Sequence, residues 1–281
     1  MIWIGHEDHQ GSGDDGHDQD GEEFLTKAIF GLTVEGVDVE GRFLVAVVDF
    51  DDPVRLVRID AARTLAAVPK ESLAEPQRQA VQRGVAELIT AEMTNADRPE
   101  SHLNIGLIHV DQGQFDRAEA AYRAALNLQP TFTEAAVNLA DLYRLQGRDA
   151  DGEKTLRQAL DLDPHNAAAH HALGLLLIRQ QRLPEARTAL AEAARLDKDN
   201  PRYGYVYAVA LNGAGQGEQA IQALEAVLAT HPNDRDILLA LVAFQRDAGN
   251  LAAAREYARR LAALEPDNPQ IQALLRPLEA N

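Results

Sequence analysis

Small and helix-breaking residues recur every 34 residues between residues 99 and 268. One position of the period is small in most copies: Gly106, Ala140, Gly174, Ala208 and Val242. A second position is mostly glycine: Gly113, Gly147, Gln181, Gly215 and Gly249. A third position holds Ala118, Gly152, Ala186, Ala220 and Ala254, and a fourth holds Pro130, Pro164, Lys198, Pro232 and Pro266. This period is typical of arrays of helix pairs, in which each pair buries its apolar side only against its neighbours.

Gly106 stands inside a segment whose pattern is otherwise helical. Glycine within a helix costs on the order of 1 kcal/mol relative to alanine, so this position needs a packing reason. We expect the second helix of the pair to cross closely at Gly106, with Ala118 facing it. Gly113 is expected to end the first helix in the left-handed conformation, and Pro130 to follow the second helix.

These spacings resemble the tetratricopeptide repeat family, which has a small residue in its first helix, an Ala early in its second and a closing Pro. The expected repeats are residues 99–132, 133–166, 167–200, 201–234 and 235–268. The family usually has a bulky aromatic residue where this chain has His102, Ala136, His170, Gly204 and Leu238. The resemblance implies an all-α, right-handed solenoid. Residues 76–98 are expected to form a half-repeat capping helix, and residues 269–281 a C-terminal capping helix.

The segment 24–75 gives a different pattern. Residues 51–69 resemble a HEAT repeat, with Asp52 and Pro53 at the turn followed by Val57 and Arg58 and by an Ala-Ala-x-x-Leu run. The upstream helix of this HEAT-like segment would be residues 41–50. Its β-branched residues also suit a strand, and residues 33–39 could form one arm of a hairpin. We favour the helix, because a lone hairpin is marginal without a larger sheet.

Charge is concentrated near the N-terminal end. The net charge is −17, and residues 1–40 contain eleven acidic residues against Lys27 alone. Nucleic acid and an anionic membrane surface are therefore not expected as partners. Membrane insertion is not expected either, because the apolar run in the opening MIWIGHEDHQ is too short for a membrane span. The composition of residues 1–23 predicts an acidic, disordered tail. His6, His9 and His17 within it could bind nickel, zinc or copper, but a solvated tail without fixed ligands is the favoured interpretation.

The sequence lacks the common motifs for catalysis. The sequence contains no phosphate-binding loop, no dinucleotide fingerprint, no G-x-S-x-G motif and no cysteine. His170 and His171 are adjacent and point to different sides of a helix, while His102 and His109 occupy positions that the family fills with packing residues. We therefore predict a non-enzymatic protein without a cofactor.

The first helices of a tetratricopeptide array usually line a concave groove that holds a peptide or a partner helix. Mapping the repeats onto one another places at this groove Leu103, Leu107, Val110, Val137, Asp141, Arg144, His171, Leu175, Ile178, Tyr205, Val209, Asn212, Leu239, Ala243 and Arg246. A mostly apolar lining with a few polar points suits such a ligand. Burial of some of these side chains between repeats is the alternative.

We predict a protein or peptide partner that docks near the third and fourth repeats, where Ile178 and Tyr205 would lie on neighbouring helices. The chain's acidity favours a ligand with basic residues. The Lys, Asn and Arg clamp with which some family members hold chaperone tails is matched here only by Asn138.

The order of a HEAT-like segment, a half-repeat and an alanine-rich array also resembles the C-terminal part of bacterial multihaem cytochrome c proteins. Those proteins are exported and carry haem before the repeats. This chain has no Cys-x-x-Cys-His motif. We therefore expect a cytoplasmic protein as the sequence is written, exported if the true N-terminus lies upstream, with a cytochrome-derived accessory module as an alternative.

Overall fold

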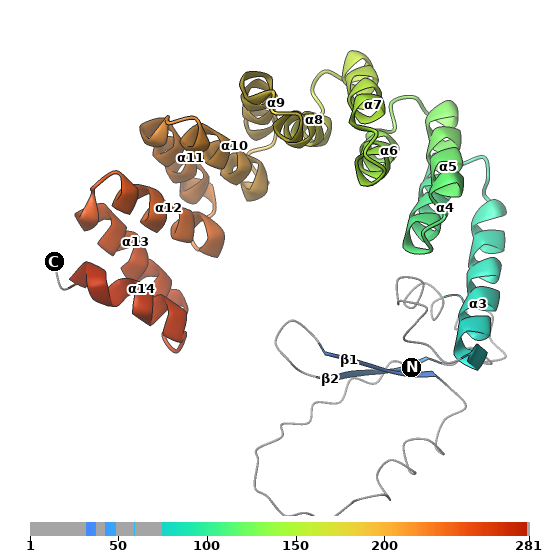
Figure 1. Cartoon of the computed structure of the whole chain (residues 1–281), viewed down its shortest axis with the longest axis horizontal. Coiled ribbons are helices and arrows are strands. Elements are labelled where there is room, and N and C mark those ends of the chain that lie inside the picture. Colours follow the sequence, from blue (N-terminus) through green and yellow to red (C-terminus); the bar gives the residue numbers. More distant parts are fainter. Residues whose placement is uncertain (1–31, 38–42, 49–58, 60–74, 280–281) are drawn as a thin grey trace, which may run out of the picture. The chain divides into compact units, whose positions relative to one another are not determined.

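The structure is a computed structural model that describes residues 32–37, 43–48, 59 and 75–279 (Figure 1). The chain divides into two compact units, Met1–Leu128 and Gln129–Asn281. The acidic tail and most of the HEAT-like motif at 51–69 lie outside the described residues. The fold of each compact unit follows from the repeat pattern, with one exception upstream of the array.

That exception is a β-hairpin. Strand β1 (Leu32–Val37) pairs antiparallel with strand β2 (Phe43–Val48), so that Leu32 lies opposite Val48 and Val37 opposite Phe43. The helix expected for residues 41–50, and with it the upstream half of the HEAT-like segment, is therefore wrong. Val45, Val47 and Val48 are β-branched and favour extended backbone. Pairing with β1 supplies the backbone hydrogen bonds, and the described sheet has two strands.

The first compact unit contains three described helices, α3 (Glu75–Met93), α4 (Pro99–Asp111) and α5 (Phe115–Leu128). Helix α3 packs on α4, and α4 packs on α5. Val81, Val85 and Leu88 of α3 are buried, at the helical spacing that the sequence shows. Met93 stays exposed because the helix ends there.

The close helix crossing expected at Gly106 is present. A Cβ atom on Gly106 would lie 2.2 Å from Cε1 of Tyr122, a side chain of α5 that is 1% exposed. The space beside Gly106 is thus filled by an aromatic ring of the partner helix, which confirms the packing reason for this glycine.

The second compact unit continues the array with α6 (Thr133–Leu145), α7 (Asp149–Leu162), α8 (Ala167–Arg179), α9 (Leu183–Leu196), α10 (Pro201–Gly213), α11 (Gly217–Thr230), α12 (Arg235–Asp247), α13 (Leu251–Leu264) and α14 (Pro269–Glu279). Each of these helices packs on the next one along the chain from α6 to α14. Within this unit, α6, α8, α10 and α12 line the inner side of the curve, and α7, α9 and α11 the outer side (Figure 1). The predicted all-α solenoid is confirmed for residues 75–279.

The turns between paired helices share one left-handed residue. It is a glycine with φ between +68° and +80° at Gly113, Gly147, Gly215 and Gly249. Gln181 adopts the same conformation at φ 61° without being a glycine. The backbone bond from Arg182 to Leu177, 2.9 Å, repeats the bond from Arg148 to Tyr143, 2.8 Å. The predicted helix-ending role of this position is therefore confirmed, and Gln181 adopts it at a steric cost.

Apolar side chains of the second unit form two core clusters. One joins α6 to α9 around Leu156, Leu173 and Leu177. The other joins α10 to α14 and includes Ile271 and Leu275 of α14, which seal the end of the array. The boundary between the two clusters falls where α8 and α9 meet α10.

Candidate protein-interaction surface

The inner helices of the second compact unit repeat three surface positions. The first position holds Val137, His171, Tyr205 and Leu239, the second holds Asp141, Leu175, Val209 and Ala243, and the third holds Arg144, Ile178, Asn212 and Arg246. They follow one another at i, i+4 and i+7, so they lie along one face of each helix. We call these twelve residues the inner face.

Two exposed apolar side chains lie in the middle of the inner face. Leu175 on α8 is 39% exposed and Val209 on α10 is 43% exposed, and they occupy the same position of consecutive repeats. Exposed apolar groups that recur at one position of a surface are more informative than scattered ones.

Charged residues flank this apolar centre. On α6, Nε of Arg144 lies 3.0 Å from a carboxylate oxygen of Asp141, and both side chains are exposed. On α12, Arg246 is exposed and lies 3.5 Å from Asp247. The inner face thus offers polar groups of both signs at its ends.

Other inner-face side chains are half-buried and belong to the cores. Val137 and Ile178 pack against the cluster of α6 to α9. Tyr205 and Leu239 pack against the cluster of α10 to α14. Ile178 and Tyr205, expected to share one ligand side chain, are therefore attached to different cores, one on each side of the joint between α8 and α10.

His171 is the most enclosed residue of the inner face. It is 8% exposed, and its ring centroid lies 4.7 Å from that of Tyr203 on α10. Neither ring nitrogen has a hydrogen-bond partner among the described residues. Burial lowers the pKa of His171, and the positive charge of Arg202 lowers it further. His171 is therefore a neutral side chain that joins two repeats and not an open contact point for a ligand.

In the first compact unit, α4 carries the corresponding positions. Leu107 is exposed, while Leu103 and Val110 are half-buried. The three corresponding positions of α4 are thus all apolar.

The remaining histidines of the first helices have structural contacts that the sequence did not reveal. Nε2 of His102 lies 3.0 Å from the carbonyl oxygen of Ala96, and Nε2 of His170 lies 2.9 Å from that of Pro164. Gln272 of α14 donates to the carbonyl of Pro266 at 3.0 Å. All three contacts join a residue to the carbonyl six positions earlier. The family usually has a bulky aromatic residue at this repeat position. Here a polar side chain instead contacts the backbone of the loop that precedes the helix.

His109 is buried on α4, and burial is the main cause that lowers its pKa. No group of three or more His, Cys, Asp or Glu that could hold a metal ion occurs among the described residues. His6, His9 and His17 lie outside them. None of the helices that the structure describes is long and apolar enough to span a bilayer.

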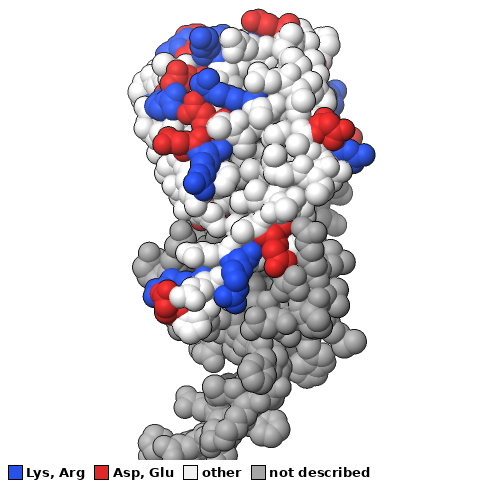
Figure 2. Space-filling view, turned by 90° about the vertical axis from the view of Figure 1, so that its right-hand side faces the viewer, with Lys and Arg blue, Asp and Glu red and all other residues white. Residues whose placement is uncertain are grey.

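Figure 2 shows basic and acidic side chains next to one another on the visible face of the described residues. Some ion pairs of the described residues join successive repeats. Arg182 on the turn before α9 contacts Glu153 of α7 at 2.7 Å, and Arg179 of α8 contacts Asp149 at 2.9 Å. Exposed ion pairs of this kind contribute little individually to the stability of the fold. Because each basic side chain lies beside an acidic one, these pairs do not form an extended basic surface.

Helix pairs in a regular register, with an inner face of apolar and charged side chains, define a helical repeat protein, a fold that is consistent with a protein-interaction scaffold. Models of the tetratricopeptide repeat match residues 153–209 and 211–277, and a second model of the same repeat matches residues 103–153. Together these matches span more than half of the chain. The chain belongs to the tetratricopeptide repeat family.

Solved structures show the same fold. The crystal structure of MamA has a TM-score of 0.51 at 23% identity, over 60% of this chain and 92% of MamA. PilW, described as a widely conserved type IV pilus biogenesis factor, has a TM-score of 0.56 at 20% identity, over 80% of this chain and 99% of PilW. PilF of Pseudomonas aeruginosa has a TM-score of 0.54 at 22% identity, over 65% and 83%. No curated protein matches the chain. The resemblances to HEAT repeats and to multihaem cytochromes stay predictions.

Proposed function

We propose that the protein is a non-enzymatic scaffold that binds an extended peptide or a partner helix on its inner face. The observation that carries this proposal is the pair of exposed apolar side chains, Leu175 and Val209, at one position of consecutive repeats. Helical repeat arrays use the extended concave surface that their curvature creates to bind partners. The tetratricopeptide fold is consistent with this use.

The ligand that fits this face is amphipathic. Its apolar side chain would cover Leu175 and Val209, and its polar groups would reach the pair of Asp141 and Arg144 at one end and Arg246 at the other. A helix presents apolar anchors at i, i+3 and i+4, and an extended peptide presents every second side chain, so both can match a periodic apolar centre. The charges of both signs favour a ligand that is itself of mixed charge.

A peptide-display selection against the full chain tests this proposal. Peptides that bind the wild-type chain should bind Leu175→Asp and Val209→Asp at least about ten-fold more weakly, a loss of about 1.4 kcal/mol. Leu183→Asp is the matched control, because Leu183 is an equally exposed leucine at the start of the outer helix α9. Equal binding by the Leu175 and Val209 variants, with helicity unchanged, would place the ligand elsewhere.

Metal binding by the N-terminal histidines and a redox role derived from a cytochrome are the two competing functions. No observation on the described residues favours either. Calorimetry with nickel or zinc, on the full chain and on a chain that begins at Phe24, would reveal a metal site in the tail.

A further inference from the structure

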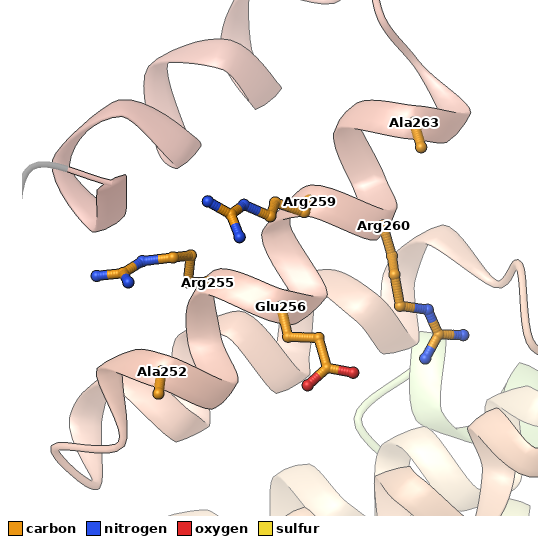
Figure 3. Close-up of a pocket in the computed structure, with 6 residues that line it drawn as sticks. All are labelled: Ala252, Arg255, Glu256, Arg259, Arg260 and Ala263. Atoms are coloured by element: carbon orange, nitrogen blue, oxygen red, sulfur yellow. The ribbon is translucent and has the colours of Figure 1, made fainter.

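Helix α13 carries an open hollow of about 510 Å³. The hollow is lined by Ala252, Arg255, Glu256, Arg259, Arg260 and Ala263. From the first to the last of these residues the helix rises about 16 Å, at about 1.5 Å per residue. Arg255 and Arg259 extend to one side of the helix, and Glu256 and Arg260 to the other (Figure 3). We call these six residues the arginine face, and none of them belongs to the inner face.

Two of the three arginines are oriented by uncharged groups. Nε of Arg255 donates to the carbonyl oxygen of Leu278 near the end of α14. Arg260 donates to the carbonyl oxygen of Pro232, in the loop before α12, at 2.7 Å. A carbonyl orients a guanidinium without cancelling its charge, and the other N–H groups of the guanidinium can bind a ligand. Among the described residues, neither Arg255 nor Arg260 forms an ion pair with a carboxylate.

The third arginine already binds a carboxylate. Both Nε and Nη2 of Arg259 donate to one oxygen of Glu279 at 3.2 Å. The two side chains are 63% and 46% exposed, and an ion pair this open is weak, so a carboxylate of a ligand can replace Glu279. Arginine is the side chain best suited to bind carboxylates with paired N–H groups. The chemistry of the arginine face therefore favours an acidic ligand.

The part of the chain that contains the arginine face carries no net charge. Residues 235–281 contain six Arg and six Asp or Glu, whereas the whole chain has a net charge of −17. At physiological ionic strength, exposed charges more than about 8 Å apart are largely screened from one another. The acidity of the chain as a whole therefore does not keep an acidic ligand away from this face.

The spacing of the arginines suits an extended peptide. Arg255 and Arg259 are separated by a helix rise of about 6 Å, and side chains i and i+2 of an extended peptide lie about 6.6 Å apart. Side chain i+3 of such a peptide points to the opposite side, where Arg260 lies. The length of the face corresponds to about five extended residues. We propose that the arginine face binds an extended acidic segment of a partner protein, with carboxylates at positions i, i+2 and i+3.

Fluorescence anisotropy with the full chain and a synthetic peptide tests this proposal. The probe is Gly-Glu-Ala-Glu-Glu-Gly with an uncharged fluorophore, and the control peptide has Gln in place of each Glu. At low salt the acidic probe should bind with a Kd below about 1 mM, and the control peptide should bind at least about ten-fold more weakly. An acidic probe that does not bind, or equal binding of the two peptides, would overturn the proposal.

An ion pair on α9 supplies matched control variants. Arg195 contacts Glu192 at 2.5 Å, and its side chain is 59% exposed, close to the value for Arg259. Arg259→Gln should weaken binding of the probe about three-fold or more, whereas Arg195→Gln should leave it unchanged. Glu279→Gln removes the competing carboxylate and should strengthen binding about two-fold, whereas Glu192→Gln should not. Because loss of folding cannot strengthen binding, the Glu279 variant separates a direct contact from damage to the fold.

Three further outcomes would count against the arginine face. Equal effects of the two arginine variants, or of the two glutamate variants, would mean that net charge governs binding. Leu175→Ala should leave the affinity of the probe unchanged, and a loss there would place the acidic peptide on the inner face instead. Sodium phosphate should displace the probe no better than sodium chloride of equal ionic strength. Stronger displacement by phosphate would show a site for small anions and would overturn the proposal.

Discussion

The ring of His171 on α8 stacks on the ring of Tyr203 on α10, with 4.7 Å between centroids and 38° between planes. This contact bridges the place where one apolar core ends and the next begins. A buried imidazole without hydrogen bonds packs as an aromatic ring while it is neutral, and it is costly to bury once it is charged. The joint between the third and fourth repeats is therefore sensitive to protonation.

Stability should fall as the pH drops below about 6.5, the ordinary histidine value, because the unfolded chain takes up a proton that the folded chain resists. The pKa of His171 is lowered in the folded chain, so its neutral form stabilises the fold. His171→Phe keeps the stacking on Tyr203 and removes the titration. Between about pH 7 and pH 5 this variant should lose less unfolding free energy than the wild type, by up to about 1 kcal/mol.

Urea denaturation at both pH values measures this difference. His109 titrates in both proteins, so the comparison isolates His171. The exposed His165→Phe serves as control and should follow the wild type. Identical losses in the wild type and in His171→Phe would show that this histidine does not govern the pH response.

Gly106→Ala should destabilise the first repeat. The added Cβ would lie 2.2 Å from the Tyr122 ring, and forcing extra atoms into a packed core typically costs about 1–3 kcal/mol. Thermal unfolding followed by circular dichroism measures the effect. At Gly213, the last residue of α10, a Cβ would meet no atom within 4 Å, so Gly213→Ala should be neutral or stabilising. If the Gly106→Ala protein were as stable as the wild type, α4 and α5 would have to lie further apart at Gly106 than they do in the structure.

Gln181→Gly should stabilise the third repeat by about 1 kcal/mol, because left-handed backbone costs a residue with a Cβ about that much. Gly147→Gln makes the converse change at the same repeat position and should destabilise by a similar amount. The midpoints of urea unfolding report both changes. Shifts of the same sign in the two variants would contradict a shared backbone cause.

Tyr205→Ala should weaken binding of a selected peptide by at least about 1 kcal/mol, roughly five-fold, since tyrosine is enriched at binding hot spots. Tyr205 lies half-buried on α10 beside the exposed Val209, so its loss changes the surface while the core residues around it remain. Arg187→Ala on α9 is the control remote from the inner face. Fluorescence anisotropy with the labelled peptide measures both, and unchanged affinity in the Tyr205 variant would exclude it from the contact.

The repeat register, the closeness of the helices at Gly106 and the left-handed turns at Gly113 and Gly147 could all be predicted from the sequence. These features depend on residues within a single helix pair, where a missing Cβ or a positive φ has one physical meaning. The same period places Leu175 and Val209 at equivalent positions of consecutive repeats.

Contacts between elements decided the rest. Residues 43–48 form a strand because a second strand is available to pair with them, and a local pattern rich in β-branched residues does not reveal that partner. His171 is buried because Tyr203 of the next repeat covers it. Within the repeat array, the sequence by itself determined which segments become helices and where they turn, since hydrogen bonding and sterics act over a few residues. Only the tertiary structure decided which side chains meet, because burial and electrostatic contact depend on residues far apart in the chain.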